Sequence, residues 1–251
     1  MLYVYRAAHG HSPDAHPTGF SRKTADERVE DKRADQFQSS ADFFIAANRG
    51  LREASVRMFF LVTGASGVGK TSVRKLIETE IAGQVAVCEL GTLGITPEWS
   101  LRWRHQAVEQ VVQLALQHQK SGKHFLLCGD PVPPGELYAA PSAVELAGIQ
   151  VCLLDASAER QTERLTLRGD SADLIPHHVA FAEWMRRHVV DHRHRPEVII
   201  NQGWEQMRWQ VWHSGEITVV PWNSHIVDTS DLKPIEVARQ VLSWIKLHVK
   251  D

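Results

Sequence analysis

Short apolar runs alternate along this chain with longer segments in which apolar residues recur every three or four positions. The runs predict buried strands, at residues 58–63, 85–90, 124–128, 149–154 and 225–228. The periodic segments predict helices, at residues 71–81, 98–120, 141–148, 158–168, 175–190 and 234–249. Strands that are apolar throughout and alternate with helices are typical of an α/β protein, with a parallel sheet covered on both faces.

The chain begins with a segment that lacks this pattern. Residues 1–40 mix His, Asp, Arg, Lys, Ser and Gln and show almost no apolar periodicity after the opening LYVY. Such a composition is typical of a disordered or loosely attached leader. A short helix at 41–56 is expected to pack beside the first strand. We therefore divide the chain into a loosely packed leader, residues 1–55, and a main domain, residues 56–251.

Composition excludes some classes of function. With 251 residues and 43% hydrophobic content, the chain can bury the core of one domain of ordinary size. The net charge is −2 and no long basic run occurs, so nucleic acid is not an expected partner. No apolar run approaches the roughly 20 residues of a membrane span, and no signal pattern opens the chain. We expect a cytoplasmic protein without membrane contact, in which Cys88, Cys128 and Cys152 are reduced, buried packing residues.

The segment MFFLVTGASGVGKTS, residues 58–72, carries the strongest chemical signal. Gly64, Gly69, Lys70 and Thr71 have the G-x-x-x-x-G-K-[ST] spacing of a phosphate-binding loop, the Walker A motif. The context agrees, because an apolar run that predicts a strand precedes the loop and a helical pattern follows it. A glycine-rich turn with an incidental lysine is the alternative.

The chemistry of phosphate binding explains this spacing. Several backbone N–H groups must converge on a polyphosphate, and glycines at 64, 67 and 69 permit the conformations and close approach that this requires. Lys70 brings a charge to the outer phosphates, the Thr71 hydroxyl can ligate Mg²⁺, and the helix adds its positive N-terminal end. The nucleotide-binding residues are predicted to be Gly64, Ala65, Ser66, Gly67, Val68, Gly69, Lys70, Thr71 and Ser72.

A phosphate-binding loop also needs a carboxylate near its Mg²⁺, usually at the end of a strand beside the loop strand. Asp130 and Asp155 both follow apolar runs that predict strands. Asp130 leads into a loop rich in Gly and Pro, whereas Asp155 precedes Ala-Ser-Ala-Glu, which is typical of a helix N-cap region. We favour Asp130 as the metal ligand. A turn-forming Asp before Pro is the alternative for that residue.

Glu89 is a candidate general base. It lies at the C-terminal end of the second predicted strand, the edge at which open α/β sheets bind ligands. A carboxylate at this place can accept a proton from a hydroxyl that attacks the γ-phosphate. A solvated carboxylate at a strand end is an equally good interpretation.

Three arginines recur every four residues in the predicted helix 158–168. Arg160, Arg164 and Arg168 therefore share one helical face. Guanidinium groups on one side of a helix suit the charge of a transferring phosphoryl group. The alternative is a solvated face on which the arginines pair with Glu159 and Glu163.

These segments together resemble the nucleoside monophosphate kinase-like branch of the P-loop kinases. That branch includes adenylate, shikimate, gluconate and deoxynucleoside kinases, and related chains are grouped as AAA family proteins. The resemblance is carried by the loop at 64–71, the strand end at 129–130, the run 154–169 and the strand end at 226–230. It covers about residues 57–170 and 225–250.

The resemblance implies a three-layer P-loop NTPase fold with five parallel strands in the order 2-3-1-4-5. It also implies ATP and Mg²⁺ as cofactors and a mobile lid, for which we assign the insertion at about 160–222. Arg164 and Arg168 match the lid arginines, and Asp130 matches the carboxylate that ends the third strand. Glu89 more loosely resembles the strand-end acid that serves as base in deoxynucleoside kinases.

The predicted function is that of an ATP-dependent small-molecule kinase. Lys70 and the loop amides would hold the phosphates, Thr71 and Asp130 the Mg²⁺, and Glu89 the acceptor hydroxyl, while the two lid arginines steady the transition state. The expected acceptor is a nucleoside, nucleotide or sugar-like compound. The strand end Gly129-Asp130-Pro131-Val132-Pro133 lacks the Arg of the adenylate kinase motif Asp-Gly-x-Pro-Arg, which weighs against a nucleoside monophosphate.

Two other functions stay open. One is a nucleotide-dependent switch that orders the segment 170–222 for a protein partner, and the other is a P-loop module that binds nucleotide without chemistry. The acceptor and the oligomeric state have no signature in the sequence.

Histidine and tryptophan are concentrated in the second half of the chain. The histidines at 177, 178, 188, 192 and 194 have no Cys or carboxylate at metal-ligand spacing, so solvated helix and turn residues are expected rather than a metal site. For the tryptophans at 204, 209, 212 and 222, core packing is expected, and stacking on a flat acceptor is the alternative.

Overall fold

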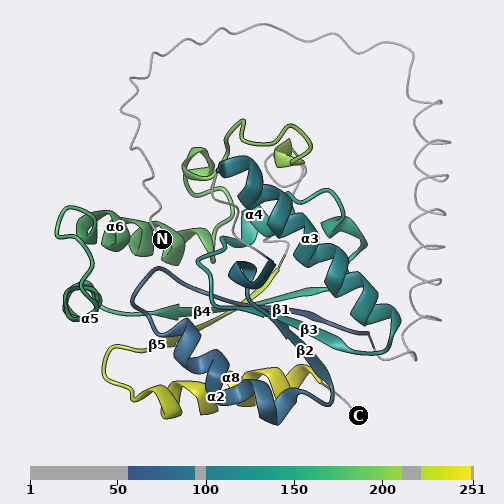
Figure 1. The fold of residues 1–251 in the computed structure, drawn as a ribbon, viewed down its shortest axis with the longest axis horizontal. Coiled ribbons are helices and arrows are strands. Elements are labelled where there is room, and N and C mark those ends of the chain that lie inside the picture. Colours follow the sequence, from purple (N-terminus) through teal and green to yellow (C-terminus); the bar gives the residue numbers. More distant parts are fainter. Residues whose placement is uncertain (1–55, 94–99, 211–221, 250–251) are drawn as a thin grey trace, which may run out of the picture. The chain divides into compact units, whose positions relative to one another are not determined.

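Five parallel strands form the sheet of this protein (Figure 1). The computed structural model describes residues 56–93, 100–210 and 222–249. The strands are β1 (Phe59–Thr63), β2 (Val85–Cys88), β3 (His124–Cys128), β4 (Ile149–Asp155) and β5 (Asn223–Asp228). They lie in the order β2-β3-β1-β4-β5, and every neighbouring pair is parallel. The predicted order 2-3-1-4-5 is therefore confirmed.

Helices follow most of the strands. The α-helices are α2 (Lys70–Ile81), α3 (Leu101–Lys120), α4 (Pro134–Tyr138), α5 (Ala158–Arg168), α6 (Ile175–His188) and α8 (Pro234–His248). Short 3-10 helices are η2 (Leu90–Leu93), η3 (Ala143–Glu145) and η4 (Pro196–Val198). The predicted leader 1–55, with its helix at 41–56, and the first residues of the helix predicted from 98 lie outside the described residues.

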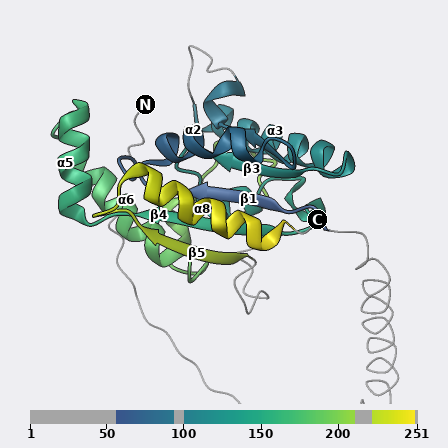
Figure 2. The same ribbon diagram turned by 90° about the horizontal axis from the view of Figure 1, so that it is seen from below.

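The central strand β1 supplies two hydrophobic cores. Phe59 and Leu61 pack with residues of α3 and α6, whereas Phe60 and Val62 pack with residues of α2 and α8. Figure 1 shows α2 and α8 together on one side of the sheet and α3 on the other, and the turned view of Figure 2 shows α8 running over the sheet. Because successive side chains of a strand point to opposite faces, a wholly apolar strand produces the three layers.

Several predicted boundaries need correction. The stretch after Asp130, predicted as a loop, already contains the short helix α4, and the helix predicted at 141–148 is only the turn η3. β2 ends at Cys88, because the chain turns there into η2. Asp155 is the last residue of β4, and the helix cap is Ser157, whose hydroxyl accepts from the Arg160 N–H at 3.2 Å. The segment that begins at Asp155 therefore contains the predicted N-cap region, with Ser157 rather than Asp155 as the capping residue.

The histidines of α6 and the turn after it differ from the prediction. His178, His188 and His192 are buried rather than solvated. The Nε2 of His188 accepts from the Gly135 N–H at 3.1 Å, and its ring stacks on Trp184 with 4.6 Å between centroids. Burial lowers the pKa of His188 to about 3, so the ring is neutral at ordinary pH. Within the described ranges, no group of His, Cys, Asp and Glu has the arrangement of a metal site.

The remaining packing predictions hold for the described tryptophans and for two of the three cysteines, but not for Cys88. Cys128 and Cys152 are fully buried in their strands, and burial raises the pKa of Cys128 to about 12. Cys88 is half-buried. Trp204 and Trp222 belong to the core, Trp209 packs against it, and Trp212 lies outside the described residues. In the part of the chain that the structure describes, none of the helices has the length and apolar character needed to cross a bilayer.

Candidate functional site

The loop between β1 and α2 has the backbone conformation that its glycines predict. Gly64, Gly67 and Gly69 have φ values of 145°, 86° and 99°, a region that other residues rarely adopt. Gly64 is also required for steric reasons, because a Cβ there would lie 2.2 Å from the backbone oxygen of Leu154 on β4. The loop is thus pressed against the neighbouring strand, which fixes its shape.

Lys70 is folded back into this loop. Its ammonium group donates to the carbonyl oxygens of Gly64 and Ala65, both at 2.8 Å, and the residue is only 6% exposed. Burial lowers the pKa of Lys70 to about 8, although the negative charges of Asp130 and Glu89 partly oppose this shift. The loop therefore surrounds a charge that phosphate oxygens would stabilise better than two neutral carbonyls do.

The start of α2 offers further anion donors. Gly69 is the N-cap residue, and no side chain caps the helix. The first backbone N–H groups of a helix have no partner within the helix. Lys70, Thr71 and Ser72, which carry these groups in α2, line the cavity described next. Thr71 and Ser72 are exposed. Backbone donors, a lysine and two hydroxyls together fit the phosphates and the Mg²⁺ of a nucleotide.

A cavity of about 540 Å³ opens in front of the loop. Loop residues, strand ends, α5 and α8 contribute to its walls: Ser66, Gly67, Val68, Gly69, Lys70, Thr71, Ser72, Val73, Gly129, Pro131, Arg164, Arg168, Thr229, Leu232, Pro234 and Val237. The wall formed by Leu232, Pro234 and Val237 is apolar, whereas the wall of the loop is polar and positive. One cavity thus combines an anion site with a surface for a flat apolar group.

Glu89 and Asp130 meet at the C-terminal ends of β2 and β3. The Oδ2 of Asp130 accepts from the Leu90 N–H at 2.6 Å, so the carboxylate bridges the two strand ends. A Cβ at Gly129 would lie 2.6 Å from the carboxylate oxygen Oε1 of Glu89. Neither acid lines the cavity, but both adjoin Gly129, and Gly129 does line it. The two predicted acids therefore lie together at the rim of the cavity.

The segment that carries Asp130 is held firmly. The Thr63 hydroxyl donates to the Val132 carbonyl at 2.6 Å, and Arg104 of α3 donates to the Pro131 carbonyl at 3.0 Å. Arg104 also forms two 2.6 Å bonds with Glu136 of α4, and both side chains are buried. Sequence reasoning missed this pair, because a charged residue in an amphipathic helix is normally solvated.

Asp155, the alternative metal ligand, is engaged elsewhere. Its two carboxylate oxygens accept from Arg186 of α6 at 2.5 and 3.0 Å. The negative charges of Asp130 and Glu89 act on the buried Lys70 ammonium and raise its pKa against the effect of burial. Of the two candidate acids, the structure brings Asp130 near the loop lysine.

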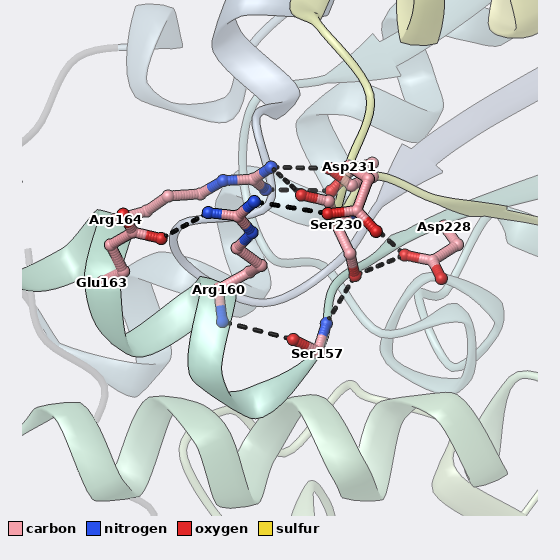
Figure 3. Close-up of polar contacts among 8 residues, drawn as sticks. Ser157, Arg160, Glu163, Arg164, Asp228, Ser230 and Asp231 are labelled. Atoms are coloured by element: carbon pink, nitrogen blue, oxygen red, sulfur yellow. Dashed lines mark hydrogen bonds and ion pairs between the residues drawn. The ribbon is translucent and has the colours of Figure 1, made fainter.

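The arginines of α5 separate into different environments. Arg164 lines the cavity but is anchored, since it donates to the Thr229 carbonyl at 2.5 Å and to the Thr229 hydroxyl at 3.0 Å. Figure 3 shows it reaching from α5 to the segment after β5, where Ser230 also accepts. Arg160 pairs with Glu163 and Asp231 and is exposed (Figure 3). Arg160 therefore belongs to a solvated helix face, as the alternative interpretation of the three arginines proposed. Arg164 instead links α5 to Thr229, the residue that follows β5.

Arg168 combines access to the cavity with an ionic partner. It lines the cavity, its side chain is 54% exposed, and it pairs with Asp170 through bonds of 2.5 and 2.7 Å. The hydrogen bonds that Arg168 donates to Asp170 raise the pKa of Arg168, so the guanidinium is charged at every ordinary pH. An exposed arginine with one ionic partner can change partners when an anion enters the cavity.

The strand order and the conformation of the loop after β1 are those expected of the P-loop NTPase fold. Comparison with known proteins adds only a likeness to solved structures that have low sequence identity to this chain. No model of a known protein family matches it, and no curated protein matches it either. The similar solved structures include an unliganded sugar kinase from a Janibacter species, with 13% identity, a TM-score of 0.47, and coverage of 78% of this chain and 99% of that chain.

Two further solved structures are comparable. The APS kinase of Mycobacterium tuberculosis, in complex with AMPPNP and APS, has 18% identity, a TM-score of 0.42, and coverage of 76% of this chain and 98% of that chain. The tunicamycin resistance protein of Deinococcus radiodurans has 17% identity, a TM-score of 0.44, and coverage of 75% and 95%. At these values the likeness carries no argument about activity, which has to come from the site itself.

Proposed function

We propose that this protein is a phosphotransferase that moves the γ-phosphate of Mg-ATP to a small acceptor. The observation that carries the proposal is the position of the Glu89 carboxylate at the rim of the cavity whose floor is the phosphate-binding loop. A nucleotide-binding module without chemistry has no need of an acid at that place. A kinase needs a group there that orients the attacking oxygen.

Different residues are proposed to bind the phosphates, the base and the Mg²⁺ of the nucleotide. The loop amides and Lys70 hold the phosphates, and the apolar wall at Leu232 and Val237 receives the base. Thr71 and Asp130 are the proposed ligands of Mg²⁺, which when bound neutralises charge on the phosphate oxygens. Arg168 leaves Asp170 to contact the same oxygens. The cytoplasmic localisation expected from the sequence is part of this proposal.

Glu89 favours a hydroxyl as the attacking group. An acceptor phosphate beside this carboxylate would place like charges in contact, whereas a hydroxyl donates a hydrogen bond to it. The absence of the arginine found in the adenylate kinase motif agrees with this view. We therefore propose a hydroxyl-bearing acceptor, such as a nucleoside or a sugar-like compound, in preference to a nucleotide.

Replacing Glu89 by glutamine should lower kcat for acceptor phosphorylation about 100-fold or more, because an amide cannot accept the hydroxyl proton. The KM for ATP should stay within about twofold, since Glu89 is not part of the cavity wall. Glu80→Gln is the matched control, because Glu80 lies on the outer face of α2 and pairs with Lys246. Wild-type turnover in the Glu89 variant would exclude this residue from the mechanism.

The activity itself is tested by ADP release from Mg-ATP in the presence of pooled nucleosides, nucleotides, sugars, sugar acids and aminoglycosides. Stimulation by a pool above the ATP-only rate is expected, and division of that pool then identifies the acceptor. ATP binding without stimulation by any pool would contradict the kinase proposal. It would favour instead a nucleotide-dependent switch, the alternative that the sequence left open.

The pKa of Lys70 predicts how nucleotide affinity depends on pH. The pKa is about 8 without ligand, and a bound polyphosphate must raise it, because the charged form gains opposite charges. Affinity should therefore be constant below about pH 8 and fall by up to about tenfold per pH unit above it. Titration of a fluorescent ATP analogue between about pH 7.5 and 9.5 measures this slope. Lys70→Ala should lose the slope, whereas Lys75→Ala, which alters an exposed neighbour, should keep it.

A further inference from the structure

Arg74 of α2 contacts the candidate base directly. Its Nη2 lies 2.9 Å from the Oε2 of Glu89, and its Nη1 lies 2.6 Å from the Oε2 of Glu78. The Arg74 side chain is only 18% exposed and that of Glu89 23%, so both groups are largely shielded from water. The ion pair between them is therefore less screened than one on an open surface.

Gly129 also lies close to the Glu89 carboxylate. A Cβ on Gly129 would lie within 2.7 Å of three carboxyl-end atoms, namely Cγ, Cδ and Oε1. Two elements therefore restrict the acid: α2 through the Arg74 guanidinium, and the end of β3 through the Gly129 backbone. Together these two contacts define the position of the carboxylate more closely than either contact alone.

The helix that carries Arg74 also carries the phosphate-binding residues. α2 begins at Lys70, and its first residues line the cavity, while Arg74 lies one turn further along. The contact between Arg74 and Glu89 therefore connects the proposed base to the helix whose first residues are proposed to bind the phosphates of ATP. In a kinase, such a connection would fix the attacking oxygen relative to the γ-phosphate.

We propose that Arg74 is a positioning residue that fixes the Glu89 carboxylate relative to the phosphate-binding loop; the inference rests on the proposed kinase function. In the transfer, the acceptor hydroxyl gives its proton to Glu89 and its oxygen forms the new bond to the γ-phosphorus. The bond from that phosphorus to the β–γ bridging oxygen breaks, and ADP leaves with the electron pair. Catalysis of such a step depends mainly on positioning, and a shift of about 1 Å can cost about 100-fold in rate.

The first arm of the test is a kinetic double-mutant cycle on the full chain. Arg74→Met should lower kcat for acceptor phosphorylation about 10- to 100-fold, with the dissociation constant of ATP within about twofold of wild type. In the Glu89→Gln background the same substitution should change kcat less than about twofold, because no base remains to be positioned. Arg74→Lys should restore part of kcat. Lys75→Met is the matched control, because it also replaces a cationic side chain by methionine, at the exposed neighbouring position.

A merely structural arginine would behave differently. It would lower the melting temperature and weaken ATP binding together, and its effect on kcat would be equal in both backgrounds. Equal effects, or an unchanged kcat in Arg74→Met, would overturn the inference.

The second arm does not depend on activity. Urea unfolding of wild type, Arg74→Met, Glu89→Gln and the double variant measures the coupling between the two side chains. We expect the unfolding equilibrium constants to depart from additivity by about threefold or more. Additive constants would overturn the inference even if the chain proves to be a kinase. Coupling without acceptor-stimulated ADP release would instead show that the ion pair is real and that the proposed function is wrong.

Discussion

Replacing Lys70 by alanine should reduce acceptor-dependent ADP release about 1000-fold or more. Lys70 is the buried cation of the loop, with hydrogen bonds of 2.8 Å to two carbonyl oxygens that phosphate oxygens would replace. A charge-assisted donor aimed at a transferring phosphoryl group is worth about 10²–10³ in kcat, and weaker binding of the donor adds to the loss. A coupled assay of ADP under saturating Mg-ATP measures the effect.

Two control variants make this result interpretable. Lys75→Ala removes an exposed lysine from the same helix and should turn over at the wild-type rate. Lys70→Arg keeps the charge but changes the shape of the donor, and we expect it to recover only a minor part of the activity. The Lys70→Ala protein should keep the circular dichroism spectrum of the wild type. Substantial acceptor-dependent turnover in a folded Lys70→Ala protein would exclude the proposed phosphate site.

Replacing Gly64 by alanine should abolish nucleotide binding and lower stability by about 3 kcal/mol or more. Two costs add at this position. A Cβ would lie 2.2 Å from the Leu154 backbone oxygen, which cannot rotate away as a side chain would, and φ is 145°. The loop can accommodate the methyl group only by moving away from β4, and its N–H groups then no longer converge. For a domain of this size the loss corresponds to about 6–12 °C in Tm.

Gly83→Ala is the matched control for this substitution. Gly83 lies in the turn before β2, and a Cβ there would have no atom within 4 Å. Thermal unfolding and binding of a fluorescent ATP analogue should both be close to wild type in this variant. A Gly64→Ala protein with normal Tm and normal affinity would show that the close approach to β4 is not required for nucleotide binding.

The fold was largely predictable because its signals are local. β3 and α5 have the predicted bounds, since a run of buried residues and an amphipathic face each mark an element without reference to the rest of the chain. The misassigned elements were short. α4 begins with two residues, Pro134 and Gly135, that usually indicate a loop, and the three-residue turn η3 has too few positions to show a period.

The site was predictable only in part. Glu89 and Asp130 were selected from their places at strand ends, and the adjacency of β2 and β3 brings them together. Arg74 has no signature in the sequence, because an arginine in an amphipathic helix is usually solvated and its partner lies 15 residues further along the chain. Likewise, nothing in the sequence distinguishes Arg164, which is anchored to Thr229, from Arg168 four residues later, which lines the cavity beside Asp170.

The sequence by itself determined the conformation of the glycine-rich loop after β1, because glycines at 64, 67 and 69 followed by Lys70 specify a backbone conformation within one short segment. It also determined the layered α/β arrangement, since wholly apolar strands must be covered on both faces. Only the tertiary structure decided that Asp155 pairs with Arg186, that Glu89 pairs with Arg74, and that His188 is buried and neutral. These facts depend on side chains that meet across different elements, and burial and pairing of that kind follow from packing rather than from local pattern.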